Sequence, residues 1–276
     1  MAPLKFCANI SWLFAELPEL TQRMRDAARA GFRAVEAAWI YSSDLKELKT
    51  VKDETGLEFA LINTPPGKTA RAPILLLHGM HGLNNKLIFG SDLGRQYTFS
   101  NFILVFYYRI HLMAGRVPAG ADRCAVAMEM EDTFVQNLKH AAGVLSKEGI
   151  LGLIEPINTR ITDPRYFLDS PHQAAVILQR VAHPSIRMQM DIYHWQIMDG
   201  NLTQNIRKYL PMTGHIQIAQ VPDRHEPDSD GELSYTYLFK LLEELDYQDY
   251  IGCEYKPQRS TEAGLDWLRR YWSSHN

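Results

Sequence analysis

Short apolar runs alternate along the chain with longer amphipathic stretches, and this alternation is the first structural signal in the sequence. There are eight such runs, most of them after turn signals or polar residues: KFCANI (5–10), AVEAAW (34–39), LEFALIN (57–63), RIHLMAG (109–115), GILGLIEP (149–156), IRMQMDI (186–192), GHIQIAQ (214–220) and YIGCEY (250–255). Parallel strands joined by helices produce such an alternation. Eight strands of this kind predict a closed (β/α)8 TIM barrel of the α/β class.

Helix boundaries are also legible between the apolar runs. Residues 17–31 and 130–149 each end in a glycine, which suits a helix C-terminus, and residues 130–149 also carry apolar residues at three- and four-residue spacing. The stretch 170–184 begins with Ser170 and Pro171, an N-cap followed by a first-turn proline. No linker or repeat divides the chain, so residues 1–276 are expected to form a single barrel domain.

One segment does not fit this pattern. Residues 68–108, where the third helix of a barrel belongs, contain clustered apolar residues, several glycines and an Asn-Asn pair instead of a helical period. We therefore expect the third helical unit to be irregular or replaced, either by a long functional lid or by a segment of foreign origin, such as an altered exon boundary.

Charge and cysteine content narrow the class of protein. With 29 basic and 32 acidic residues the formal net charge is -3, which gives no electrostatic reason to bind nucleic acid. The three cysteines lack paired spacing and are expected to be buried, reduced thiols. The N-terminus lacks the features of a secretory signal, and the apolar stretches are too short to span a bilayer. A cytoplasmic protein that does not bind membranes is the expectation.

The ends of the last four predicted strands carry the strongest chemical signal. Oxygen donors stand at or near each of these ends: Glu155, Asp191, Gln217 and Glu254. Because side chains converge on the ligand at the C-terminal ends of barrel strands, these four donors predict a site for a divalent cation, Mg²⁺ or Mn²⁺. Any single carboxylate could instead cap a helix or pair with a lysine, but three at one barrel mouth would repel one another without a cation.

Residues that could orient a substrate follow the same strands. They are Asn158 and Arg160 after the fifth strand, His194 just past Asp191, Arg224 after the seventh strand and, with a weaker signal, His111 near the end of the fourth. Each has a plain alternative as a loop arginine or a buried histidine. Their position on the loops of the ligand-binding face favours contact with a substrate.

Several motifs in this order resemble the hydroxypyruvate isomerase family of the xylose isomerase-like barrels. The motifs are INTPPG, IHLMAGRVPAGADR, LIEPINTR, MDIYHWQIMDGNL, HIQIAQVPDRHEPDSDGEL and GCEYKP, and the resemblance covers residues 1–66 and 109–276. It implies interconversion of hydroxypyruvate and tartronate semialdehyde. It also implies that Glu155 and Glu254 act as acid and base around the cation, with Asp191 and Gln217 completing the metal shell. The family's amphipathic helix before the fourth strand is not recognisable in residues 68–108.

Three alternatives remain beside this interpretation. A ketose 3-epimerase or a four-carbon oxo-acid isomerase would use the same cation and glutamate pair for a related proton shift. An endonuclease IV-like barrel would need several metals, many histidines and a basic face, which a net charge of -3 and ten histidines do not favour. A catalytically impaired barrel that acts as a binding protein is the third, because the third unit is unusual.

Aromatic residues near the C-terminus bear on assembly. Trp267, Tyr271 and Trp272 lie at helical spacing. We expect them to pack a terminal helix against the barrel, and a contact between the subunits of a homodimer is the other explanation. The expected ligand in either case is a small hydroxy-keto acid.

Overall fold

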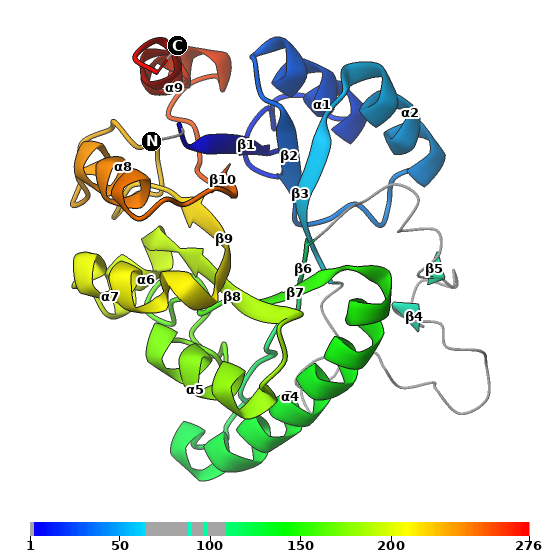
Figure 1. The fold of residues 1–276 in the computed structure, drawn as a ribbon, viewed down its shortest axis with the longest axis vertical. Coiled ribbons are helices and arrows are strands. Elements are labelled where there is room, and N and C mark those ends of the chain that lie inside the picture. The colour runs from blue at the N-terminus through cyan, green and yellow to red at the C-terminus, as the bar shows by residue number, and fades with distance from the viewer. Residues whose placement is uncertain (1–2, 65–87, 90–96, 99–108, 276) are drawn as a thin grey trace.

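The predicted barrel is confirmed. The computed structural model describes residues 3–64, 88–89, 97–98 and 109–275. Eight parallel strands close in the order β1-β10-β9-β8-β7-β6-β3-β2 (Figure 1). Their bounds are β1 (Lys5–Asn9), β2 (Ala34–Ala37), β3 (Glu58–Asn63), β6 (Arg109–His111), β7 (Leu151–Ile154), β8 (Ile186–Asp191), β9 (Thr213–Ile218) and β10 (Tyr250–Cys253).

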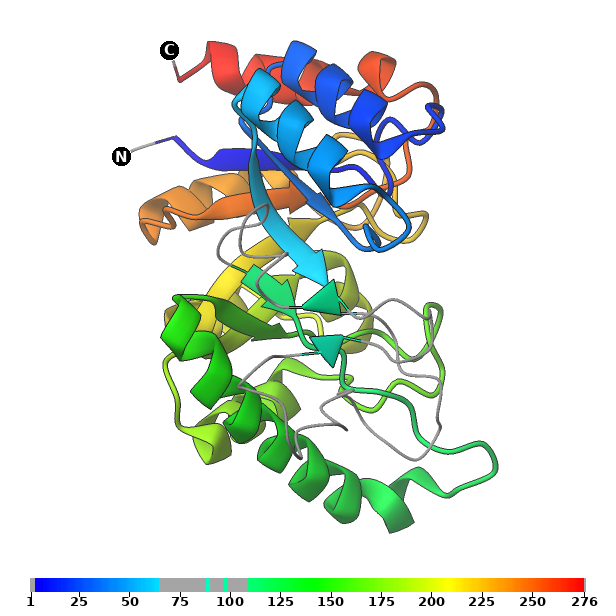
Figure 2. The same cartoon turned by 90° about the vertical axis from the view of Figure 1, so that its right-hand side faces the viewer.

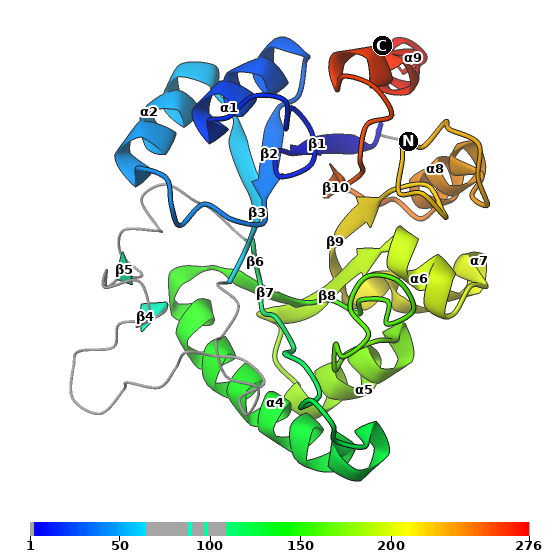
Figure 3. The same cartoon turned by 180° about the vertical axis from the view of Figure 1, so that it is seen from behind.

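Helices lie outside the strands and cover the barrel wall, as Figures 1 and 3 show from opposite sides. Nearly all residues of the strands are buried, which is usual for parallel strands with side chains packed on both faces. The helices are α1 (Leu20–Arg29), α2 (Leu45–Thr55), α4 (Arg123–Leu145), α5 (Pro171–Val181), α6 (Ile192–Met198), α7 (Leu202–Tyr209), α8 (Tyr235–Glu244) and α9 (Asp266–Ser273), with 3-10 turns at Ser146–Glu148, Leu210–Met212 and Glu262–Gly264.

The unusual segment between β3 and β6 lies largely outside the described residues. Within residues 68–108, only β4 (Ile88–Phe89) and β5 (Tyr97–Thr98) are described, and they pair antiparallel with each other. The expectation of an irregular third helical unit therefore stays a prediction.

The predicted helix ends are present where the sequence signals stand. Ser170 is the N-cap of α5 and accepts a hydrogen bond from the Gln173 amide, with Pro171 in the first turn. Gly149 ends the turn after α4 with a φ of 66°, a left-handed conformation that glycine adopts without strain. One expectation was wrong: Cys124 is exposed on α4, whereas Cys7 and Cys253 are buried. Cys124 lies in the first turn of α4, after the N-cap Asp122, where Asp122 and Ala125 are exposed as well.

An aromatic cluster packs the last helix of the chain against the first strand. Phe6 on β1 contacts Trp267 and Tyr271 of α9, with ring centroids 5.3 and 5.2 Å apart. Figure 2 shows α9 beside α1. Edge-to-face aromatic pairs stabilise such contacts beyond the buried area alone. The predicted packing of the terminal helix is thus observed.

In the part of the chain that the structure describes, no helix is long and apolar enough to cross a membrane.

Candidate active site

The four predicted cation ligands gather at the C-terminal ends of neighbouring strands. Glu155 and Glu254 directly follow β7 and β10, and Asp191 ends β8. Gln217 lies opposite Asp191 in the β8–β9 pairing. Because β7, β8, β9 and β10 are consecutive in the barrel wall, the four side chains occupy one side of its mouth.

Glu155 is a buried carboxyl group with few partners. Its side chain is 6% exposed, and its Oε2 lies 3.2 Å from Nδ1 of His111, without the geometry of a hydrogen bond. Burial raises the pKa of Glu155 well above its usual value, and the carboxylates of Glu254 and Asp191 raise it further. Burial also lowers the pKa of His111 to about 3, so this ring is neutral and offers Glu155 little compensating charge.

Asp191 has two separate tasks, one for each oxygen. Oδ1 caps α6 by accepting hydrogen bonds from the amides of Tyr193 and His194. Oδ2 faces the barrel mouth, 3.4 Å from Nε2 of His194 and 3.2 Å from a guanidinium nitrogen of Arg224. The helix-capping alternative is therefore correct for one oxygen, while the other remains available to the site.

Asn158 and His194 form a fixed pair behind the carboxylates. The Asn158 amide donates to Nδ1 of His194 over 2.7 Å and to the Thr162 hydroxyl, and its oxygen accepts from the amides of Ile161 and Thr162. All hydrogen-bonding positions of Asn158 are thus used within the protein. Burial lowers the pKa of His194 to about 4, so the ring is neutral. With Nδ1 accepting, the proton lies on Nε2, which faces Asp191 and Glu155.

Arg224 provides the positive charge of this cluster. Its guanidinium lies between the rings of Trp12 and Tyr193, 4.7 Å from each centroid, and donates to Glu254 over 2.6 Å. Burial alone would lower the pKa of Arg224, but the carboxylates of Glu254 and Asp191 raise it. Burial raises the pKa of Glu254 to about 8 even though Arg224 opposes the shift. The two aromatic rings hold the guanidinium of Arg224 in place.

Arg160 differs from the other predicted residues in its surroundings. It is exposed on the loop after β7. Within the described ranges it forms no hydrogen bond or ion pair with the carboxylates, in contrast to Arg224. The structure thus brings His111, His194 and Arg224 next to the predicted cation ligands but leaves Arg160 apart from them.

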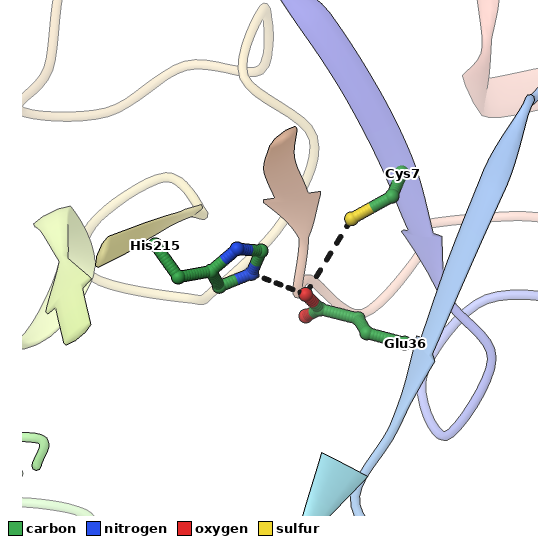
Figure 4. Close-up of side chains that lie close together, drawn as sticks. All are labelled: Cys7, Glu36 and His215. Carbon is green, nitrogen blue, oxygen red and sulfur yellow. Dashed lines mark hydrogen bonds and ion pairs between the residues drawn. The ribbon is translucent and has the colours of Figure 1, made fainter. Parts of the chain in front are cut away.

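Another buried carboxylate, Glu36 on β2, was missed by the sequence reasoning. It accepts hydrogen bonds from Asn9, Gln217, His215 and Cys7, the last over 3.5 Å. Figure 4 shows two of these donors, Cys7 and His215, directed toward Glu36. The donors come from β1 and β9, on either side of β10. One signal could have found it: Glu36 is the only charged residue in the apolar run AVEAAW, close to the end of that run.

The carboxylates at the mouth suit a divalent cation. If Glu155, Asp191 and Glu254 were all ionised, the one guanidinium beside them would leave an excess of two negative charges, since the two histidines are neutral. Ligand atoms of Glu155, Asp191 and His194 lie within 4.8 Å of one another. Oxygen donors dominate this set, and such donors favour Mg²⁺ or Mn²⁺ over softer metals. Burial is the main cause of the raised pKa values of Glu155 and Glu254, and the neighbouring carboxylates raise both pKa values further.

Fold and site together define a β/α barrel enzyme with an acidic mouth. Residues 24–271 match the family model described as xylose isomerase-like TIM barrel. Because the match covers most of the chain, the protein belongs to this family.

Curated relatives add the class of reaction. A zebrafish (Danio rerio) protein named "Putative hydroxypyruvate isomerase" is 74% identical over 276 residues, which are 100% of this chain and 98% of the relative. Hydroxypyruvate isomerase of Escherichia coli (strain K12) is 38% identical, with 97% and 99% of the two chains covered. 2-Oxo-tetronate isomerase of Cupriavidus necator is 39% identical, with 97% and 98% covered. The chain is therefore an isomerase.

Proposed function

We propose that this isomerase interconverts hydroxypyruvate and tartronate semialdehyde. The observation that carries the proposal is the convergence of Glu155, Asp191 and Glu254 with Arg224 at one barrel mouth. The names of the zebrafish and E. coli relatives support the choice of substrate.

The reaction moves one proton between neighbouring carbons. A base removes a proton from the hydroxymethyl carbon of hydroxypyruvate, an acid returns one to the former carbonyl carbon, and a proton passes from one oxygen to the other. Glu155 and Glu254 are suited to this exchange because carboxyl groups act as general acids and bases, and both side chains lie largely out of solvent at the barrel mouth. Their place after β7 and β10, on either side of β8 and β9, lets them approach a substrate from different directions.

Arg224 and His194 would bind the substrate and fix its orientation. The guanidinium of Arg224 is suited to the substrate carboxylate, since a planar fork of donors matches a carboxylate. Nε2–H of His194 points to the same space and would donate to a substrate oxygen. His111 beside Glu155 is a further contact candidate, and Arg160 would act only if the substrate extended to its loop.

Glu155, Asp191, Gln217 and Glu254 would hold Mg²⁺ or Mn²⁺. When bound, the cation supplies Lewis-acid stabilisation of negative charge on the substrate oxygens. Asp191 would offer Oδ2, because Oδ1 caps α6. Gln217 would offer its amide oxygen, because its amide nitrogen donates to Glu36.

Turnover of hydroxypyruvate in D2O, with and without metal, tests the proposal. The chelated protein is expected to be inactive, and added Mn²⁺ or Mg²⁺ should restore formation of tartronate semialdehyde with deuterium at C2. Full turnover in a verified metal-free preparation would refute the role of the cation. Absence of turnover in the metal-loaded protein would refute the substrate.

A four-carbon 2-oxo acid is the second candidate substrate. The name of the C. necator relative, 2-oxo-tetronate isomerase, favours it at 39% identity. Both candidates present a carboxylate next to a carbonyl, so Arg224 and the carboxylates would serve either. Comparing kcat/KM for hydroxypyruvate and 2-oxo-tetronate with the same metal-loaded protein would decide between them.

A further inference from the structure

The cluster formed by Glu36 and its donors lies beside the proposed cation site but contains none of its carboxylates. Glu36 is 1% exposed and His215 is fully buried. Oε1 of Glu36 accepts from the amides of Asn9 (2.8 Å) and Gln217 (2.7 Å), and Oε2 accepts from His215 Nε2 (2.6 Å) and the Cys7 thiol. A buried carboxylate with this many donors is satisfied without any cation.

We propose that Glu36 is a positioning residue that sets the direction of the Gln217 amide and thereby presents its oxygen to the cation. This inference rests on the proposed function, because it assigns Gln217 to the cation shell. Oε1 of Glu36 already accepts a hydrogen bond from the Asn9 amide and accepts another from Gln217, so the amide group of Gln217 turns its NH2 toward Glu36. The oxygen of Gln217 then faces away from Glu36, where it accepts from Gln189 over 2.6 Å and keeps a second lone pair.

Asn9 links Glu36 to a second residue of the proposed cation site, Glu254. Its amide nitrogen bridges Glu36 (2.8 Å) and Oε1 of Glu254 (3.1 Å), while its oxygen accepts from the Ser11 amide. Because the NH2 group of Asn9 faces both carboxylates, Glu36 also helps to hold Glu254. Outer residues of this kind fix the orientation of the groups that contact the metal.

Gly252 on β10 leaves room for the Glu36 carboxylate next to the strand. A Cβ at Gly252 would lie 2.4 Å from both carboxylate oxygens of Glu36. Glycine at this position therefore lets the carboxylate approach the strand closely, between the donors of β1 and β9. A larger residue would have to displace the carboxylate from its donors.

Cys7, Glu36 and His215 also have the residue types of a metal site, with ligand atoms within 4.8 Å of one another. Two observations favour orientation over metal binding. Each oxygen of Glu36 already has two donors. Burial raises the pKa of the Cys7 thiol well above its usual value, and the thiol form is a donor and not a metal ligand.

The test uses Mn²⁺ alone as the probe and measures its affinity by electron paramagnetic resonance, together with turnover. Glu36→Met keeps the length of the side chain but removes the acceptors, and we expect about 10- to 100-fold weaker Mn²⁺ binding. Glu36→Gln keeps one acceptor oxygen for Gln217 and Asn9, while its NH2 can donate to His215 if that ring shifts its proton to Nδ1. Glu36→Gln should therefore stay within about threefold of the wild type, because only the charge is lost.

The same substitution in a Gln217→Ala background distinguishes a loss of amide orientation from a general loss of structure. In Gln217→Ala there is no amide to orient, so the effect of Glu36→Met should shrink to about a third or less of its value in the wild-type background, as expected for coupled residues. An equal effect in both backgrounds, or equal losses in Glu36→Met and Glu36→Gln, would overturn the proposal. Unchanged affinity in Glu36→Met would do the same.

Two glycine variants keep the test decisive if Glu36→Met does not fold. Gly252→Ala crowds the carboxylate and should weaken Mn²⁺ binding, whereas Gly143→Ala on α4, where an added Cβ meets nothing within 4 Å, should leave it unchanged. Equal affinities in the two variants would count against the proposal. Failure of the wild type to bind Mn²⁺ would overturn the proposed function and this inference together, while normal wild-type binding without dependence on position 36 overturns only the inference.

Discussion

Two groups of buried carboxylates lie side by side in this barrel, and their surroundings differ. Glu36 accepts hydrogen bonds from four side chains. Glu155, by contrast, has a neutral histidine and two other carboxylates as its main neighbours. A buried charge is tolerated where donors surround it, and it is costly where they do not. This contrast supports the proposed roles: Glu36 has the surroundings of a fixed structural carboxylate, whereas those of Glu155 suit a group that would exchange a proton or bind a cation.

The largest expected effect comes from replacing either of the two glutamates proposed as acid and base at the barrel mouth. Glu155→Gln or Glu254→Gln should lower kcat for hydroxypyruvate by about 10²- to 10⁴-fold, the usual contribution of a general acid or base. Steady-state kinetics with saturating Mn²⁺ measures this. Glu129→Gln on the exposed face of α4 is the matched control and should leave kcat unchanged. Near-normal turnover in either active-site variant would remove that residue from the proposed mechanism.

The second expected effect separates substrate binding from cation binding. Arg224→Ala should lower kcat/KM for hydroxypyruvate by about 10- to 100-fold, because hydrogen bonds to charged groups contribute roughly 1.5–3 kcal/mol. Mn²⁺ affinity should stay the same or rise, since a positive charge next to Asp191 and Glu254 is lost. Arg160→Ala is the matched control and should change kcat/KM by less than about twofold, because Arg160 is exposed.

A loss of Mn²⁺ affinity in Arg224→Ala comparable to the loss of kcat/KM would contradict this separation. It would mean that Arg224 acts mainly by holding Asp191 and Glu254 in place. An effect of Arg160→Ala as large as that of Arg224→Ala would instead extend the substrate site to the loop after β7.

The sequence was sufficient for the barrel and for the residues at the ends of its last four strands. Strand-end positions are defined by the apolar runs themselves, so Glu155, Asp191 and Glu254 could be read directly from the pattern. Glu36 could not be assigned in this way. Its role depends on Gln217 and His215, which are about 180 residues away in the chain and reach it only across the closed barrel. Likewise, the surroundings that distinguish Arg224 from Arg160 exist only in three dimensions.

The smallest expected effect is a change of folding stability with pH in the metal-free protein. In the unfolded chain a glutamate has its usual pKa of 4.5, whereas the folded protein raises the pKa of Glu254 to about 8 and that of Glu155 well above the usual value. Between pH 6.5 and 8 the folded state therefore binds more protons than the unfolded state, and its stability must fall as pH rises. The lowered pKa values of His111 and His194 act in the opposite direction, but only below their usual value of 6.5. Just above pH 6.5 the rings still lose protons in the unfolded state, which reduces the slope, and about one pH unit higher they are neutral in both states, so the carboxylates decide the direction of the trend.

The size of this effect follows from the linkage of proton binding to folding. A difference of one bound proton changes stability by about 1.4 kcal/mol per pH unit, so the window from 6.5 to 8 corresponds to roughly 1–2 kcal/mol and a decrease of a few degrees in Tm. Differential scanning calorimetry of the chelated protein measures it. Saturating Mn²⁺ should remove the decrease, because a cation favours the ionised carboxylates and binds more tightly as they lose their protons. In Glu155→Gln the slope of Tm against pH should become smaller, whereas Glu129→Gln should keep the slope of the wild type. A metal-free protein whose Tm rises between pH 6.5 and 8 would show that the carboxylates of the mouth are as well compensated as Glu36, and the contrast between the two groups would then be lost.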